Sequence, residues 1–95
     1  MIILPIGSVV SVTDVDSPVM IYGYLQKTEE SSSVYDYIGC RYPVGIADDS
    51  FFLFNRDNIQ KLHFVGLQDA EALEFQSAIE AFSIAEGGNK NVLDM

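Results

Sequence analysis

The run Tyr35–Gly45, which reads YDYIGCRYPVG, constrains the fold more than any other part of this sequence. Aromatic and β-branched side chains favour a pleated, half-buried surface, so this run is predicted to form a strand. A glycine inside a strand, here Gly39, typically marks a bulge or a close approach of two backbones. We therefore predict a bent central strand that is ended by Pro43 and Gly45.

Other apolar runs, alternating or continuous, predict four more strands. The five predicted strands cover residues 8–12, 19–26, 35–42, 51–54 and 61–65. On the central strand, we predict that Ile38 and Cys40 face the core and that Asp36 lies near the adjacent loop, where water reaches it. On the last strand, Leu62 and Phe64 are predicted to point inward.

A change from strand to helical spacing follows the last strand and predicts one helix over about residues 69–86. Asp69 can cap its start, and Gly87–Gly88 can end it. Residues 87–95 are predicted to form a flexible C-terminal tail. The apolar positions that we expect on one helix face are Ala72, Phe75, Ala78, Ile79 and Phe82.

These elements predict a single domain over residues 1–86 in the α+β class, mainly β. The expected architecture is a five-stranded, strongly bent antiparallel sheet or a small open SH3-like barrel, with the C-terminal α-helix covering an opening or an edge. The polar turn at residues 55–58, before the fifth strand, resembles the short helical turn of SH3-like barrels. That analogy concerns the fold and fixes no function.

The charge balance excludes several classes of partner. Fourteen acidic residues against five basic ones give a net charge of −9, which argues against binding to nucleic acid or to an anionic membrane. The apolar N-terminus lacks a basic region and is interrupted by Pro5 and Gly7, so neither a signal peptide nor membrane insertion is predicted. The single Cys40 cannot form an internal disulfide, and a cytoplasmic location is predicted.

Groups suited to catalysis are scarce in this sequence. His63 is the only histidine, which excludes catalytic triads and metal sites built on a pair of histidines. Cys40 is predicted to be buried, as free cysteines usually are. The acidic pairs 14/16 and 48/49 do not fit the calcium-binding loop pattern. We predict a non-enzymatic protein with no catalytic residue, cofactor or metal; the alternative is a small enzyme centred on Cys40 or His63.

Two surfaces are candidates for binding another protein. One comprises the tyrosines of two strands, on faces expected to be less buried, because tyrosine and arginine are common in interfaces. The same tyrosines could instead lie beneath the helix. The other surface is the helix region 69–86, whose five acids and absence of bases suit either solubility or a basic helical partner. The candidate protein-binding residues are Tyr22, Tyr24, Tyr35, Tyr37, Arg41, Glu71, Glu74 and Glu80.

Three motifs give the chain a family resemblance: LPIGSVV at residues 4–10, MIYG at 20–23 and YDYIGCRYPVG at 35–45. With them, the chain resembles the domain-of-unknown-function 4176 family. The resemblance extends over about residues 4–82 and continues in the residues Phe54, Asp57, Asn58, Ile59, Phe64, Gly66 and Phe75. The first and third motifs together are specific, whereas either alone is weak.

The resemblance implies a function that composition does not reveal. Members of the family are small proteins of Gram-positive bacteria, commonly encoded in type VII secretion loci beside LXG toxins and their small helical partners. It implies a cytoplasmic chaperone or targeting adaptor for an LXG effector or its adaptor, and supplies no catalytic residues. The alternative is an immunity protein that neutralises a toxin domain. The type VII export signal, a tyrosine followed four positions later by an acid, is absent, so we expect the protein to stay inside the cell.

Overall fold

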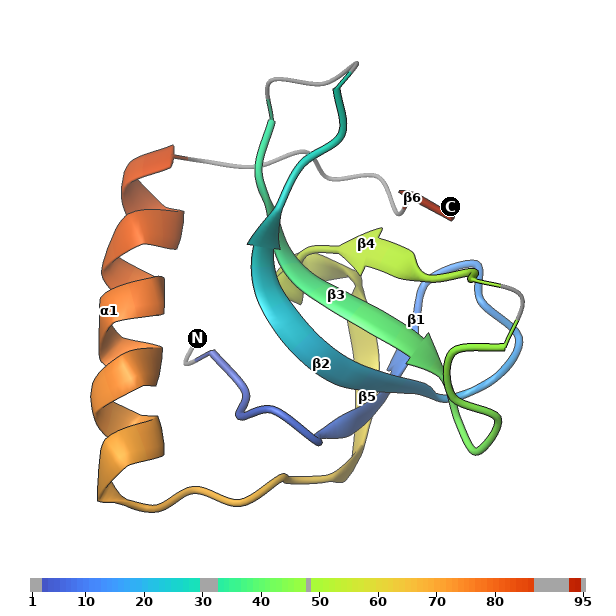
Figure 1. Cartoon of the computed structure of the whole chain (residues 1–95), viewed down its shortest axis with the longest axis horizontal. Helices are drawn as coiled ribbons and strands as arrows, with labels where there is room; N and C mark the ends of the chain where they lie inside the picture. The colour runs from blue at the N-terminus through green and yellow to red at the C-terminus, as the bar shows by residue number, and fades with distance from the viewer. Residues whose placement is uncertain (1–2, 30–32, 48, 87–92, 95) are drawn as a thin grey trace.

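The computed structural model describes residues 3–29, 33–47, 49–86 and 93–94. Its elements form one bent antiparallel sheet with a long helix to one side (Figure 1). The strands and helices are β1 (Val9–Val12), β2 (Val19–Gln26), β3 (Tyr35–Arg41), β4 (Phe52–Phe54), the 3₁₀-helix η1 (Arg56–Asn58), β5 (Ile59–Phe64), α1 (Ala70–Glu86) and β6 (Leu93–Asp94).

The order of strands in the sheet is β5-β1-β2-β3-β4-β6. The five predicted strands and the C-terminal helix are confirmed, and the sheet is open. The short helix η1 joins β4 to β5 where the polar turn was compared with that of an SH3-like barrel. Within the described residues, no helix is long and apolar enough to cross a membrane.

A bulge in β2 decides which of its side chains face the core. The pairing with β3 steps from Ile21 to Gly23, so Tyr22 is an extra residue without a partner on β3. One extra residue reverses the faces of all positions that follow it. Ile21 and Tyr24 therefore both contact the core, although an uninterrupted strand would place them on opposite sides of the sheet.

The core-facing side of β3 carries Tyr37 and Gly39, so the prediction that Ile38 and Cys40 face the core is wrong. Tyr37 is paired with Tyr24 and with Phe54, and all three contact the core cluster. Cys40 is buried, as predicted, but on the opposite side of β3. Alternation shows which residues of β3 share a face, but not which face is buried. The face of Tyr37 is buried because its partners on the neighbouring strands are aromatic.

Gly39 is paired with Ile21 on β2, and atoms of β2 fill the space that a side chain would need, which is the close approach that the sequence predicted. A Cβ atom at this position would lie 2.5 Å from Val19 Cγ1 and 2.9 Å from the backbone oxygen of Met20. The bulge associated with this bend is on β2 and not on β3 itself. The absence of a side chain at Gly39 thus lets the two central strands pack against each other.

Strand β5 is exposed on both sides, contrary to the prediction that Leu62 and Phe64 point inward. Their side chains are 45% and 60% exposed. The pairing with β1 is irregular at two places, which turns Phe64 to the same face as Val9, away from the core. β5 contributes only Ile59 to the core cluster.

The predicted C-terminal tail, residues 87–95, lies mostly outside the described residues. Of this segment, the structure describes Leu93–Asp94, which form the two-residue strand β6 and pair with β4. The sequence analysis did not predict this strand.

Replacement of Gly39 by alanine should destabilise the protein by about 1–3 kcal/mol, because the new methyl group meets a backbone oxygen that cannot move aside. The matched control is Gly23→Ala, whose methyl group would meet only the side chain of Ile38, at 2.6 Å. Urea unfolding of both variants tests this. Equal losses of stability would contradict the role assigned to the Gly39 backbone contact.

Candidate protein-binding surfaces

The helix α1 meets the rest of the molecule through few side chains. Asp69 caps its start, as predicted: the Ala72 amide donates to Asp69 Oδ1 at 2.8 Å. Gln76 and Ile79 are buried, whereas Phe75 and Phe82 are 56% and 43% exposed. The predicted apolar face is only partly correct: Ile79 is buried and Ala72 half-buried, but Phe75, Ala78 and Phe82 are exposed. Gln76, which was not predicted there, shares the buried side with Ile79.

A short N-terminal segment lies between α1 and the sheet (Figure 1). Gln76 Nε2 donates to the carbonyl oxygen of Ile3 at 2.6 Å. On the sheet side, the Leu4 amide donates to Tyr37 Oη at 3.0 Å, and Tyr24 Oη donates to the Leu4 carbonyl at 2.5 Å. Polar contacts to Ile3 and Leu4 thus connect the helix to the tyrosines of β2 and β3.

Arg56, in η1, forms ion pairs with an acid on β3 and with another on α1. Its guanidinium lies 2.5 Å from Glu80 Oε1 on α1 and 3.5 Å from Asp36 Oδ2 on β3. The side chains of Arg56 and Asp36 are only 15% and 9% exposed. The prediction that water reaches Asp36 is wrong, because the backbone amide of Arg56 and its guanidinium cover this carboxylate. The bond to Glu80 raises the pKa of Arg56.

The tyrosine surface expected from the sequence does not form. Tyr35 and Tyr37 are 3% and 0% exposed, so the prediction that their face is less buried is wrong. Tyr24 is half-buried, and its ring centroid lies 5.9 Å from that of Phe75, so it lies in the contact with α1. This outcome matches the alternative in which the tyrosines lie beneath the helix.

The two remaining sheet candidates, Tyr22 and Arg41, are half-buried. Tyr22 lies beside Cys40; burial first, and then this thiol, raise the pKa of Tyr22. Arg41 Nη1 donates to Ser17 Oγ at 2.9 Å and to Asp16 Oδ1 at 3.2 Å. The structure therefore does not bring the five sheet candidates together on one accessible face.

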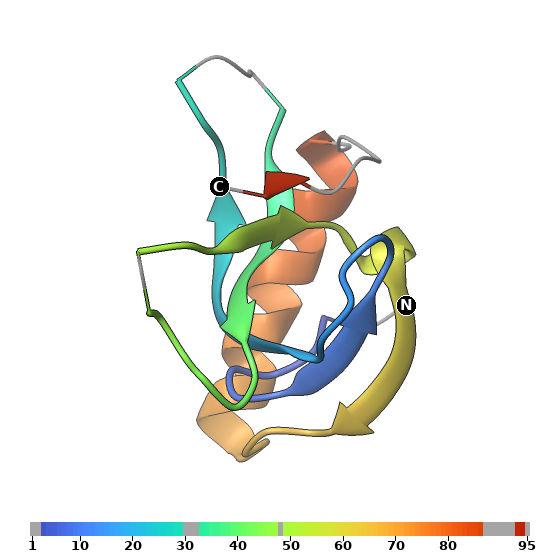
Figure 2. The same cartoon turned by 90° about the vertical axis from the view of Figure 1, so that its right-hand side faces the viewer.

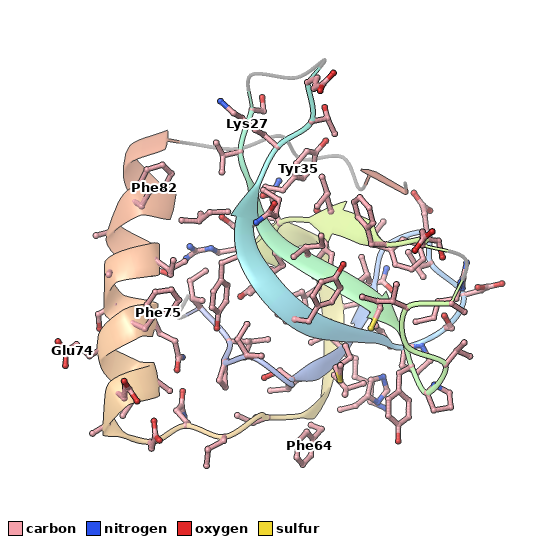
Figure 3. All side chains as sticks on the ribbon, viewed as in Figure 1. Lys27, Tyr35, Phe64, Glu74, Phe75 and Phe82 are labelled. Carbon is pink, nitrogen blue, oxygen red and sulfur yellow. The ribbon has the colours of Figure 1, made fainter. Side chains whose placement is uncertain are left out.

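The helix candidates also divide into two groups. Glu80 is engaged with Arg56, whereas Glu71 and Glu74 are exposed and form no ion pair within the described part of the chain. Figure 3 shows Phe82 above Phe75 along α1, and Glu74 directed away from the sheet. We call the exposed residues Glu71, Glu74, Phe75, Ala78 and Phe82 the acidic helix face; the first four line a hollow of about 320 Å³.

A second surface, on the outer side of the sheet, was missed by the sequence analysis. It is a hollow of about 440 Å³ that we call the outer hollow, lined by Gly7, Val9, Met20, Tyr42, His63 and Phe64. The irregular pairing of β5 with β1 places His63 and Phe64 on the same side, although they are consecutive. His63 Nε2 lies 2.8 Å from Ser11 Oγ.

The two residues considered for catalysis lie on different strands. Cys40 is on β3 and His63 is on β5, and two strands separate them in the sheet, which corresponds to about 14 Å at the usual spacing. Burial raises the pKa of the Cys40 thiol, which disfavours the reactive thiolate. Among the described residues, no group of three or more His, Cys, Asp or Glu side chains could hold a metal ion.

Comparison with known proteins gives one match. The model of the family described as "Domain of unknown function (DUF4176)" matches residues 3–75. No curated protein and no solved structure matches the chain. The matched range covers the sheet through β5 and the first turns of α1.

Replacement of Arg56 by methionine should destabilise the protein by about 3–5 kcal/mol, because it leaves the buried Asp36 carboxylate without its cation. The matched control is Arg41→Met, which breaks an exposed pair with Asp16 and should cost less than about 1 kcal/mol. Urea unfolding at neutral pH measures both. Similar losses in the two variants would show that the Arg56 contacts do not stabilise the fold.

Alkaline pH should destabilise the protein partly through Tyr37. Burial raises the pKa of Tyr37 from 10.0 to about 12, so its neutral form is favoured in the folded state. This contribution is present below about pH 10 and is lost as the pH rises towards 12; it amounts to about 3 kcal/mol. Tyr37→Phe should lose less stability over this range than the wild type, whereas Tyr42→Phe, at an exposed site, should follow the wild type.

Proposed function

The chain belongs to the DUF4176 family, and we propose that it is a non-enzymatic accessory factor that binds a type VII secretion effector. The partner is an LXG toxin or its small helical adaptor, held in the cytoplasm before export, and the protein acts as a chaperone or targeting adaptor. This context is what resemblance to the family implies. The physical support comes from the surface of α1.

The observation that carries the proposal is the acidic helix face. Phe75 is exposed beside Glu71 and Glu74, and Phe82 is exposed further along the same helix, which has no base. Large aromatic side chains near charges of one sign are typical of sites that bind another protein. Phe75 also packs against Tyr24, but 56% of it stays exposed, and solubility alone gives no reason to expose either ring.

The same face indicates the chemistry of its partner. An exposed helix accepts another helix whose apolar side chains repeat at helical spacing, and the aromatic rings supply the apolar contact. The glutamates and the net charge of −9 favour lysine or arginine at the edges of the partner helix. We therefore propose a basic amphipathic helix of the effector or adaptor as the bound segment.

Such binding would explain how a small protein without catalytic groups assists export. A long amphipathic helix exposes an apolar stripe that promotes aggregation until it finds its final contact. By covering that stripe, the acidic helix face would keep the effector soluble and release it when another component competes for the same residues. No step of this process needs a chemical reaction.

Co-expression with the neighbouring LXG protein or its adaptor should give a complex that co-purifies. The double variant Glu71→Lys/Glu74→Lys should weaken this complex at least about 10-fold, because it places cations opposite the basic helix. Glu29→Lys, an exposed change of the same kind between β2 and β3, is the matched control and should leave the affinity close to that of the wild type. Titration calorimetry at two salt concentrations measures the effect.

Two outcomes would contradict the proposal. One is the failure of the protein to bind any product of the locus. The other is rescue of cells from the mature toxin, since a chaperone changes only the accumulation or export of the toxin, whereas an immunity protein blocks its activity.

A further inference from the structure

Strand β5 forms one edge of the sheet. In the part of the chain that the structure describes, its only neighbour in the sheet is β1, and no strand pairs with its other side (Figure 2). The backbone N–H and C=O groups on such an edge can pair with another extended chain. β5 has six residues, Ile59–Phe64, which is long enough for a regular ladder.

This edge carries only some of the features that limit strand addition. Natural edge strands are often very short, contain proline, lysine or a β-bulge, or direct charges inward, and β5 has Lys61 and two register irregularities against β1. The opposite edge, β6, follows that rule with two residues. β5 instead contains no proline and exposes Leu62 and Phe64, and Val65 directly after it is also exposed. Figure 3 shows Phe64 extending away from the sheet.

Strand β5 carries one base and no acid, in a protein with a net charge of −9. Lys61 and His63 are the only charged or titratable side chains between residues 58 and 68. Lys61 forms no ion pair within the part of the chain that the structure describes. His63 shares the outer side of the sheet with Phe64 and lies beside the outer hollow. An acidic protein thus presents an exposed lysine, without an acid on the same strand, on this edge.

We propose that β5 accepts an extended, acidic segment of a partner protein as an additional strand of the sheet. Backbone hydrogen bonds to the free edge supply the pairing, and carboxylates of the added strand lie beside Lys61 and His63. An apolar side chain on the same side of the added strand packs against Phe64 at the wall of the outer hollow. The acidic helix face takes no part in this contact.

A second copy of this chain is a poorer occupant of the same edge. In an antiparallel pair related by a twofold axis at Leu62, Lys61 of one copy would lie opposite His63 of the other, so neither lysine meets a carboxylate. Each copy also carries a net charge of −9, so two whole molecules repel each other. A carboxylate of an acidic segment can lie beside Lys61 instead.

The inference rests on the proposed function only in that a protein partner supplies the strand. It gives this protein a second contact, at β5, which prefers an acidic segment, whereas the acidic helix face prefers a basic one. One partner with a basic helix and an acidic extended segment could therefore engage both sites, which raises the apparent affinity through effective concentration.

The test uses a short blocked extended peptide that carries glutamates and one valine on the same face, titrated into the ¹⁵N-labelled full chain. Backbone resonances of residues 59–64 should shift more than those of α1. Lys61→Glu should weaken binding at least about 5-fold, because the added carboxylate faces those of the peptide. Lys27→Glu, an exposed lysine after β2, is the matched control and should bind as the wild type does. Methylation of alternate backbone nitrogens of the peptide, on its pairing edge, should abolish binding.

Several results would overturn strand addition at β5. These are the absence of shifts on β5 at peptide concentrations up to about 1 mM, equal binding of the methylated peptide, or a dimer in the peptide-free protein that Lys61→Glu alters. Glu71→Lys/Glu74→Lys should leave peptide binding unchanged. If Glu71→Lys/Glu74→Lys loses the locus partner while Lys61→Glu keeps both the partner and the peptide, strand addition fails and the proposed function stands. If Lys61→Glu loses the peptide while Glu71→Lys/Glu74→Lys keeps the locus partner, the proposed function fails and strand addition stands.

Discussion

The packing of β2 against Gly39 of β3 is the constraint on which the rest of the structure depends. A side chain there would collide with Val19 and with the backbone of Met20, and Phe54 closes the space from β4. Because the strands can approach, the sheet bends and encloses a core that a flat sheet of this length could not cover. The bulge at Tyr22 belongs to the same bend, since an extra residue increases the local twist.

The bend also determines where the helix is attached. It brings η1, which follows β4, next to the start of β3, so that Arg56 reaches Asp36. The same guanidinium then binds Glu80 on α1. A helix is usually packed through an apolar stripe, but here polar contacts join Ile79 and the Tyr24–Phe75 contact in the attachment, and much of Phe75 and Phe82 stays exposed. The exposed aromatic surface of α1 is in this sense a result of how the helix is held.

The strands and the helix of this fold could be predicted from the sequence, but not which face of each one is buried. Tyrosine-rich alternation, turn residues and helical spacing identified the strands, the helix and its Asp69 cap, because these are local effects. The bulge at Tyr22 reversed the face of Tyr24, and no residue type requires a bulge at that position. Asp36 is buried because of an arginine 20 positions away, a contact that no local pattern reports. On the helix, Glu71 and Glu74 were identified correctly as exposed acids, whereas Gln76 gave no sign that it would lie in the buried contact.

The free energy needed to detach α1 from the sheet differs from the free energy of global unfolding. Inside the contact between α1 and the sheet, Gln76 Oε1 and Glu80 Oε2 are buried without a hydrogen-bond partner. Buried acceptors of this kind cost free energy that they recover when water reaches them. Detachment of the helix would hydrate both atoms, remove Ile79 from the core cluster and leave the sheet paired, so we expect it to cost less than global unfolding. Undocking of the helix as a unit would expose Tyr24 and Ile3, which it contacts in the folded state.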